Sequence, residues 1–352
     1  MSIALAGCFT RLAFNKAKAI TKLEIEMQFK QVLRRSGAAA FATFAFGALA
    51  LPASAANSIL FVGNSFTYGD PAGAAPIVQN YRPSTVTDLN GSNIGGVPAL
   101  FKSFTTQAGL DYNVSLETVP GVGVDYHYNN KFSTIVKPFD TVLLQSYSTL
   151  DGSKPGNPAT LIKYADLLGQ AFYSQNPNVD VRLTSTWSRA DQTYRPTGAW
   201  YGQPITQMAL DVRSGYNAAD AASNFINGVI PVGEAWNRAF ASGLADTNPY
   251  DGIGAGQINL WAPDSYHASI YGYYLEALTI FGNVTGRDPL SLGANEFVAR
   301  DLGINSTIAA SLQQIASAQL AAERVPEPGM LMMFLTAGGL MLVARKKKVM
   351  SR

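Results

Sequence analysis

Short apolar runs recur along the central part of the chain, and each is followed closely by Gly, Asn or Ser. Continuous apolar runs rich in branched side chains are typical of strands buried on both faces, as in a parallel sheet. The strands predicted in this way cover residues 59–62, 114–119, 141–144, 181–184 and 229–232.

Helical patterns lie between these runs, over residues 98–108, 159–173 and 206–227. Strands that alternate with helices over this length predict an α/β sandwich, with ligand chemistry at the carboxyl ends of the strands. A further helix is expected after residue 267, because Ile270, Tyr274, Ala277 and Phe281 recur at helical spacing and Gly282 is a plausible stop.

The segment 187–204 is rich in aromatic residues, Pro and Gly, and we expect it to form a long surface loop. Trp187 and Arg189 are candidates for lining a substrate cleft. The aromatic side chains could form a stacking platform for sugar rings. At least as plausible is a loop that packs its own aromatic side chains over the sheet.

Residues 1–55 resemble the leader of an exported protein. Basic residues precede a small apolar run over residues 37–51, which ends in the small-x-small pattern that signal peptidase cuts. We expect cleavage after Ala55 or Ala56, and Met27 is an alternative start that gives a leader of ordinary length. The other interpretation is a retained anchor, which is disfavoured because the run is shorter than the roughly 20 residues of a membrane span.

Residues 325–352 begin with Val-Pro-Glu-Pro-Gly, continue with an apolar stretch and end in the basic cluster 345–348. An apolar segment followed by basic residues is a stop-transfer arrangement. The whole pattern resembles the PEP-CTERM sorting tail, which an exosortase recognises and removes. The resemblance implies a bacterial protein delivered to the cell envelope, surface or extracellular matrix, with membrane contact only through this tail before sorting. An ordinary C-terminal anchor helix is the alternative.

The remaining body, residues 56–324, has a charge opposite to that of the full chain. It contains 14 Lys and Arg against 21 Asp and Glu, a net charge of −7, whereas the full chain carries +2. An acidic body argues against nucleic acid as a partner, because phosphate binding needs basic patches. The single cysteine, Cys8, lies in the leader, so the body has no disulfide and no thiolate metal ligand. We expect one domain with no metal and no cofactor.

Two short motifs contain candidates for catalysis. Ser65 follows the first predicted strand in Gly63-Asn64-Ser65, although a serine after a strand is more often a capping or turn residue. Asp264 and His267 stand three residues apart before a helix, so the carboxylate can accept from imidazole Nδ1 and leave Nε2 free as a base. The chain has only two histidines, and His267 is the one with a carboxylate at this spacing.

Together these motifs resemble the SGNH (GDSL-like) hydrolase family, over nearly all of residues 58–289. The resemblance implies a three-layer α/β/α sandwich around a parallel sheet, of flavodoxin-like type. It also implies that Ser65 is the nucleophile, His267 the general base and acid, and Asp264 the residue that orients His267. Asn64 stands where the family has Asp, which puts the subfamily in doubt more than the triad.

The same resemblance implies an oxyanion hole, the set of donors that holds the negative oxygen of the reaction intermediate. Its donors would be the Ser65 N–H, the N–H of Gly121 or Gly123, and an asparagine amide after the third strand. Gln145 stands at that position, and its amide can donate as asparagine does, with one more methylene of reach.

His127 is the second histidine, and we interpret it as a helix-borne core or cleft residue rather than as a direct catalyst. A metal site built on it is disfavoured, because only carboxylates remain to complete the ligand set.

The expected function is an exported serine esterase that removes acetyl groups from a saccharide or polysaccharide, with a small lipid or aryl ester as the next choice. The alternative from another class is a non-catalytic surface protein of SGNH fold that binds exopolysaccharide. A purely structural matrix protein would make the two motifs a coincidence.

Overall fold

The computed structural model describes residues 56–69 and 76–324. The expected signal peptide and the expected sorting tail both lie outside the described residues. Within the described part of the chain, no helix is both long enough and apolar enough to cross a membrane.

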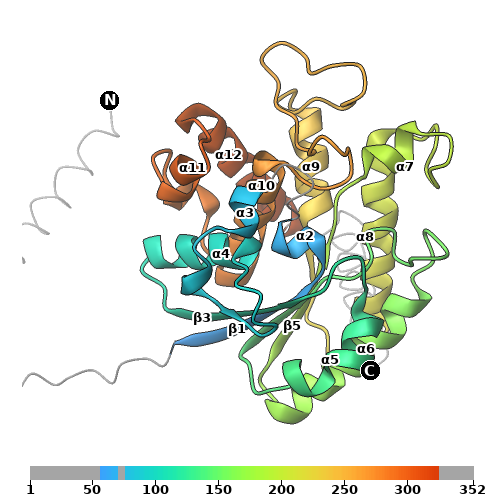
Figure 1. Ribbon diagram of the computed structural model, residues 1–352, viewed down its shortest axis with the longest axis vertical. Coiled ribbons are helices and arrows are strands. Elements are labelled where there is room, and N and C mark those ends of the chain that lie inside the picture. The colour runs from blue at the N-terminus through green and yellow to red at the C-terminus, as the bar shows by residue number, and fades with distance from the viewer. Residues whose placement is uncertain (1–55, 70–75, 325–352) are drawn as a thin grey trace, which may run out of the picture. The chain divides into compact units, whose positions relative to one another are not determined.

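A six-stranded, fully parallel sheet forms the centre of the fold, in the strand order β2-β3-β1-β4-β5-β6. Figure 1 labels β1, β3 and β5 of this sheet. The strands are β1 (Asn57–Gly63), β2 (Thr87–Asp88), β3 (Tyr112–Thr118), β4 (Thr141–Leu144), β5 (Asp180–Ser185) and β6 (Val229–Pro231). All five predicted strands are therefore present, and only the two-residue edge strand β2 is additional.

Without β2, the strand order is that of a flavodoxin-like, doubly wound sheet, in which the chain changes direction of winding between β1 and β4. Ligands of such sheets bind outside the carboxyl ends of the strands at this switch point. Here those ends are the residues after Gly63 on β1 and after Leu144 on β4, which lie on neighbouring strands.

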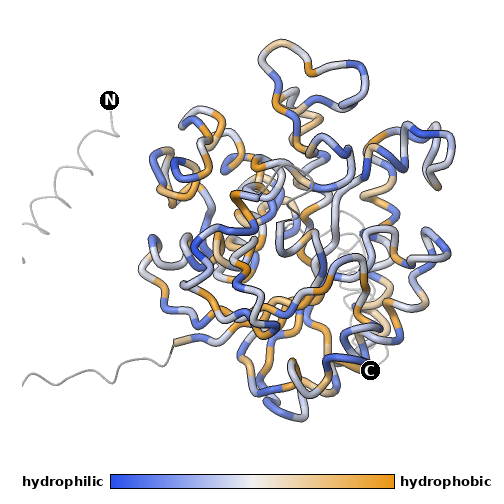
Figure 2. Tube along the Cα trace, in the orientation of Figure 1, coloured by the Kyte–Doolittle hydropathy of each residue, from blue (hydrophilic) through white to orange (hydrophobic). Residues whose placement is uncertain are grey.

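Helices cover both faces of the sheet, because the inner strands are apolar on both sides. Ile59 and Phe61 of β1 belong to one buried cluster, and the alternating Leu60 and Val62 belong to the other. Figure 2 shows the resulting hydrophobic character of the strands at the centre of the molecule. The first cluster is completed by α4 (Gly96–Gln107), α9 (Val232–Ala241), α10 (Ile270–Thr285) and α12 (Ser306–Glu323), and the second by α5 (Val124–Ile135), α6 (Ala159–Gln175) and α8 (Ile205–Ala221).

These three layers confirm the predicted α/β/α sandwich. Shorter helices complete the described chain: α2 (Ser65–Tyr68), α3 (Pro76–Gln79), η2 (Pro83–Thr85), α7 (Ala190–Tyr194), η3 (Pro289–Leu292) and α11 (Phe297–Asp301).

The predicted helix stop at Gly282 is wrong. Helix α10 continues to Thr285 and ends at Gly286, whose φ of 68° is the left-handed conformation that favours glycine. At Gly282 a Cβ atom would lie 2.4 Å from Leu320 Cδ1. Glycine at this position therefore allows α12 to pack closely against α10, and it does not end the helix.

The expectation of a surface loop over residues 187–204 is also wrong at its beginning. Trp187 is fully buried, stacked on Trp236 at 4.6 Å and on Phe66 at 4.3 Å between ring centroids. Trp200 is buried as well, whereas Tyr201 is 56% exposed. The large aromatic surface of Trp187 is removed from water in the core, so this side chain cannot line an open cleft.

Candidate active site

Ser65 occupies the turn between β1 and α2. The Asn64 side chain caps α2 by accepting a hydrogen bond from the Phe66 N–H at 3.1 Å. A Cβ on Gly63 would run into the Thr67 hydroxyl and the Gln145 amide oxygen, so glycine allows these two side chains to pack against the turn. The turn therefore fixes Ser65 at the carboxyl end of β1, where the doubly wound sheet binds ligands.

Two further contacts hold this turn against neighbouring elements. Asn64 Nδ2 donates to the Val122 carbonyl at 2.8 Å, which ties the turn to the segment that follows β3. The Tyr273 hydroxyl of α10 donates to the Ser65 carbonyl at 2.9 Å. The amide of Asn64 thus performs a structural role for which an aspartate has no N–H donor.

Ser65, His267 and Asp264 form a continuous chain of hydrogen bonds, although Ser65 is more than 200 positions away from His267 in the sequence. Ser65 Oγ lies 2.9 Å from His267 Nε2, and His267 Nδ1 lies 2.6 Å from Asp264 Oδ2. Ser65 is 3% exposed and His267 is 7% exposed. This geometry allows the imidazole to take the serine proton while the carboxylate holds the other ring nitrogen.

The loop that contains Asp264 and His267 is itself tightly ordered. Asp264 Oδ1 accepts the backbone N–H groups of Tyr266 and His267, each at 3.0 Å, and Ser265 takes a left-handed φ of 59°. Burial raises the pKa of Asp264, but the hydrogen bonds from His267 and from the two backbone N–H groups outweigh it and lower the pKa below its ordinary value. Asp264 is therefore a carboxylate at neutral pH.

Gln145 lies beside the turn, but its amide is already engaged. Its Oε1 accepts the Asn64 N–H at 2.9 Å and the Thr67 hydroxyl at 3.2 Å, and its Nε2 donates to the Ser146 carbonyl. The arrangement therefore does not match the expectation that Gln145 donates to an oxyanion. The longer side chain folds back along the strand end and braces the nucleophile turn instead.

Gly121 and Gly123 lie in the turn between β3 and α5, next to Asn64 through its bond to Val122. Gly121 takes a left-handed φ of 68°. A Cβ on Gly123 would lie 2.4 Å from the Tyr147 ring, so glycine allows Tyr147 to pack against this turn. Ser65 contributes a backbone N–H that has no hydrogen-bond acceptor within residues 56–69 and 76–324.

His127 lies away from this site, in the core. It is fully buried on α5, with Nδ1 at 2.5 Å from Glu117 Oε2 on β3. Glu117 also accepts from Asn90 at 3.1 Å and lies 3.6 Å from Lys131 Nζ. These contacts agree with the interpretation of His127 as a helix-borne core residue.

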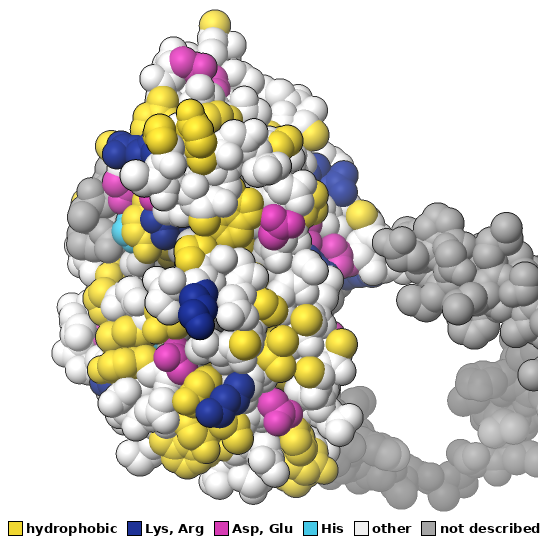
Figure 3. Space-filling view, turned by 90° about the vertical axis from the view of Figure 1, so that its right-hand side faces the viewer, with side chains coloured by type: hydrophobic (Ala, Val, Ile, Leu, Met, Phe, Trp, Pro, Cys, Tyr) yellow, Lys and Arg dark blue, Asp and Glu magenta, His cyan; other side chains and the backbone are white. Residues whose placement is uncertain are grey.

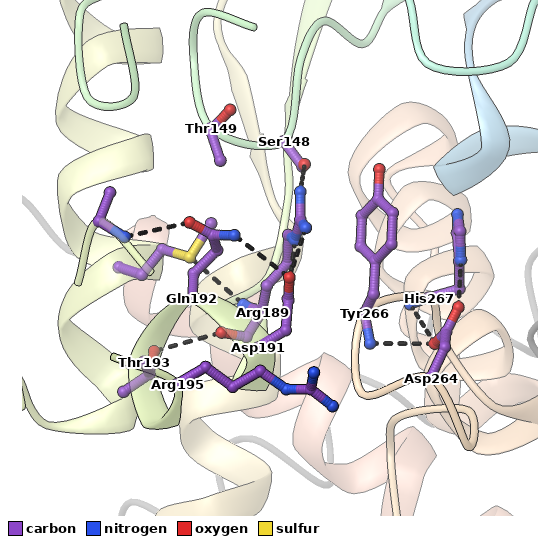
Figure 4. Close-up of polar contacts among 12 residues, drawn as sticks. Ser148, Thr149, Arg189, Asp191, Gln192, Thr193, Arg195, Asp264, Tyr266 and His267 are labelled. Carbon is purple, nitrogen blue, oxygen red and sulfur yellow. Dashed lines mark hydrogen bonds and ion pairs between the residues drawn. The ribbon is translucent and has the colours of Figure 1, made fainter. Parts of the chain in front are cut away.

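Arg189 lies beside the triad, and it contacts a residue that the sequence did not single out. Its guanidinium carbon lies 3.6 Å from the centre of the Tyr266 ring, and the Tyr266 ring in turn lies 4.0 Å from the His267 ring (Figure 4). Asp191 holds Arg189 through two hydrogen bonds, at 3.0 Å and 2.6 Å. The position of Tyr266 inside Asp-x-x-His was the only signal for it in the sequence.

No group of three or more His, Cys, Asp or Glu side chains in the described ranges is arranged to hold a metal ion. On the side shown in Figure 3, basic and acidic side chains are interspersed among hydrophobic ones, and neither charge forms a continuous patch.

No protein-family model and no curated protein matches the chain. Several solved structures do match it. A DUF4886 family protein from Bacteroides uniformis is 16% identical, with a TM-score of 0.50 over 78% of this chain and 98% of that chain. An acetylxylan esterase from Geobacillus stearothermophilus is 14% identical, with a TM-score of 0.42 over 71% of this chain and 95% of that one. At these identities the first likeness shows the fold alone, and the second adds nothing to it.

Proposed function

We propose that this protein is a serine esterase of the SGNH type, with Ser65 as nucleophile, His267 as general base and acid, and Asp264 as the residue that orients His267. One observation carries the proposal: the unbroken hydrogen-bond chain from Ser65 Oγ through His267 to Asp264. It lies at the switch point of a doubly wound sheet, where this class of fold binds its ligands.

The reaction follows from the positions of these three side chains. His267 Nε2 takes the Ser65 proton as the serine oxygen attacks the ester carbonyl carbon, and then gives that proton to the departing alcohol. Water then enters, and His267 takes one of its protons as the water oxygen attacks the acyl carbon. The bond from that carbon to Ser65 Oγ breaks, His267 returns the proton to Ser65 Oγ, and the acid is released. The carboxylate of Asp264 stabilises the imidazolium that forms in both halves of the reaction.

The backbone is the proposed source of the oxyanion hole. The N–H of Ser65, which has no acceptor among the described residues, is one donor. An N–H of the Gly121–Gly123 turn is the second, because this turn is tied to Asn64 beside the nucleophile. Backbone donors are preorganised by the fold and need little rearrangement when charge develops on the carbonyl oxygen.

The proposed substrate is an O-acetyl ester on a saccharide or polysaccharide. The support is the resemblance of residues 325–352 to a sorting tail of envelope and matrix proteins. With it goes the proposal that signal peptidase and an exosortase process the chain on its way to the bacterial surface. Mass spectrometry of the protein recovered from the producing cell tests this route, because both ends of the chain should be shortened.

The test of the esterase is hydrolysis of an activated acetyl ester by the purified protein, beside Ser65→Ala. Ser174→Ala is the matched control, because Ser174 is exposed on α6 and bonds only to the Ala171 carbonyl of its own helix. We expect activity in the wild type and in Ser174→Ala, and a loss of at least about 10⁴-fold in Ser65→Ala. An inactive wild type, or equal activity in all three proteins, contradicts the proposal. Acetate release from acetylated polysaccharides then tests the substrate.

A further inference from the structure

The segment 187–191, which spans the end of the β5–α7 connection and the start of α7, holds the loop of Asp264 and His267 through three separate contacts. Trp187 Nε1 donates to the Tyr266 carbonyl at 3.2 Å, and the Asp191 N–H donates to the Ser265 carbonyl at 3.2 Å. The third contact is the Arg189 guanidinium on the Tyr266 ring. The first two contacts hold the backbone carbonyls of Tyr266 and Ser265. The contact of Arg189 differs, because it holds the side chain of Tyr266.

Arg189, Tyr266 and His267 form a stack that is visible in Figure 4. The Tyr266 ring lies between the guanidinium and the imidazole, 3.6 Å from the guanidinium carbon and 4.0 Å from the imidazole centre. The cation is therefore within about 8 Å of the proposed general base. The Arg189 side chain is 15% exposed and the Asp191 side chain 21% exposed, so water screens these charges only in part.

An unbalanced cation at this distance would oppose the imidazolium that forms during the reaction. Asp191 cancels it, because its carboxylate accepts from Arg189 Nε at 3.0 Å and from Nη2 at 2.6 Å. The remaining nitrogen, Nη1, donates to Ser148 Oγ at 3.3 Å. Arg189 is thus held over the Tyr266 ring, and the carboxylate of Asp191 balances its charge.

We propose that Arg189 and Asp191 form a charge-balanced positioning pair for His267, which acts through the Tyr266 ring. The planar guanidinium fixes Tyr266 against the imidazole, and the carboxylate prevents the cation from disfavouring proton uptake at Nε2. The inference rests on the proposed function for its catalytic meaning. Its electrostatic part concerns only the imidazole and can be measured without a substrate.

Among the described residues, the charged and titratable groups that face this imidazole come from two segments. Asp264 and Tyr266 belong to its own loop, and Arg189 and Asp191 to the segment 187–191. Helix α2 adds Ser65 and Phe66, which carry no charge at neutral pH. Changing one member of the Arg189–Asp191 pair therefore leaves one uncompensated charge of known sign near His267.

The experiment is an NMR titration of the His267 imidazole in the full chain, with its signal assigned by loss in His267→Gln. Arg189→Met leaves the Asp191 anion, and we expect its titration midpoint to rise by about 0.5 to 1 pH unit. Asp191→Asn leaves the Arg189 cation, and the midpoint should fall by about the same amount. The double variant should return it close to that of the wild type.

Arg195→Met is the matched control, because Arg195 follows directly after α7 but bonds to the Tyr250 hydroxyl at 3.1 Å instead of stacking on Tyr266. Its midpoint should stay within about 0.2 unit of the wild type, because water screens a more distant, exposed charge. If Arg189→Met fails to fold, Arg189→Gln replaces it. Shifts of the same sign in the two single variants, or shifts no larger than in Arg195→Met, overturn the proposal.

Kinetics give the second readout. If the esterase proposal holds, the acid limb of kcat/KM should move with the NMR midpoint, and Asp191→Asn should lower kcat about 3- to 10-fold at neutral pH with little change in KM. An inactive wild type whose midpoints shift as expected contradicts the proposed function and leaves the positioning pair intact. An active wild type whose midpoints stay unchanged in the variants supports the proposed function and contradicts the positioning pair.

Discussion

The two histidines of this chain make nearly the same contact with a carboxylate, in very different places. His267 Nδ1 lies 2.6 Å from Asp264 Oδ2, and His127 Nδ1 lies 2.5 Å from Glu117 Oε2. The other ring nitrogen distinguishes them. His267 Nε2 faces Ser65 Oγ at 2.9 Å, whereas His127 Nε2 is buried and has no hydrogen-bond partner among the described residues.

Position in the sheet explains this difference. Glu117 lies within β3 opposite Val62 of β1, so its side chain points into the layer of α5, where His127 is buried. Asp264 and His267 lie in a loop between β6 and α10, and His267 meets Ser65, which begins α2 just beyond the carboxyl end of β1. A histidine bonded to a carboxylate is therefore insufficient evidence of catalysis. The partner of the second nitrogen, and access for a substrate, distinguish a reactive pair from a structural one.

The largest expected effect comes from removing His267. His267→Ala should lower kcat for an activated acetyl ester by about 10⁴-fold or more, because no other described base contacts the Ser65 hydroxyl. The free energy of unfolding should fall by only about 1 kcal/mol, so the loss of activity would not come from unfolding. Steady-state kinetics and urea denaturation of the same preparation check both values, and a similar kcat in the variant would remove the distinction between the two histidines.

The next effect concerns stability, and it should appear at the other histidine. His127→Ala leaves the Glu117 carboxylate buried without its main partner, so we expect the free energy of unfolding to fall by about 3–5 kcal/mol. The double variant Glu117→Met with His127→Leu should lose less, because it removes both polar groups together. A urea midpoint of His127→Ala equal to that of the wild type would show that the buried pair contributes nothing.

Acid pH should bring the stabilities of the wild type and His127→Ala closer together. Burial raises the pKa of Glu117, but the hydrogen bond and charge of His127, with Asn90 and Lys131, outweigh it and hold the pKa below its ordinary value of 4.5. The unfolded chain then binds this proton more readily than the folded protein does. The stabilisation is complete above pH 4.5 and is lost as the pH falls through the folded pKa.

We therefore expect the stability difference between wild type and His127→Ala to shrink by about 1–2 kcal/mol between neutral pH and about pH 3. Urea denaturation over this range measures it. A difference that stays constant, or grows toward acid pH, is the opposite of this expectation.

The smallest expected effect comes from Glu276, a buried carboxyl group to which no histidine is bonded. It lies in the middle of α10, 1% exposed, with Oε2 unpartnered among the described residues, and burial raises its pKa well above 4.5. The folded protein keeps this proton while the unfolded chain loses it above about pH 4.5, so the wild type loses stability as pH rises.

Glu276→Met should therefore be more stable than the wild type at pH 8, by about 1–2 kcal/mol, with a smaller advantage at pH 5. Glu276→Gln serves as the control, since it keeps a polar group but cannot ionise, and it should share the weaker pH dependence. Thermal or urea denaturation at both pH values decides. A variant less stable than the wild type at pH 8 would mean that Glu276 has a favourable partner.

Much of the fold is readable in the sequence where a single local pattern dominates. The strand 141–144 was predicted at its observed bounds, and the helix from residue 159 at its observed start, since continuous apolar runs and helical periodicity are local signals. The ends of elements were less accurate. The predicted helix 206–227 ends at Ala221, and Val232 begins α9 instead of ending a strand, because packing decides where a marginal turn continues.

The candidate site divides in the same way. The types and spacings of Ser65, Asp264 and His267 indicated the chemistry, because so few residues in this chain can act as a base. The structural roles of Gln145 and Trp187 could not be predicted from the sequence. Either amide orientation of Gln145 is compatible with the sequence, and its position between Asn64 and Ser146 depends on the pairing of β1 with β4.

The sequence by itself determined the layered α/β fold, through apolar runs that require burial on both faces, and the three residues proposed for the triad. Only the tertiary structure showed that Ser65 lies within hydrogen-bond distance of His267, that Trp187 belongs to the core, and that Arg189 and Tyr266 lie beside the imidazole. Those contacts join segments far apart in the chain. Their distances depend on strand order and on packing between elements, which no local pattern of residues contains.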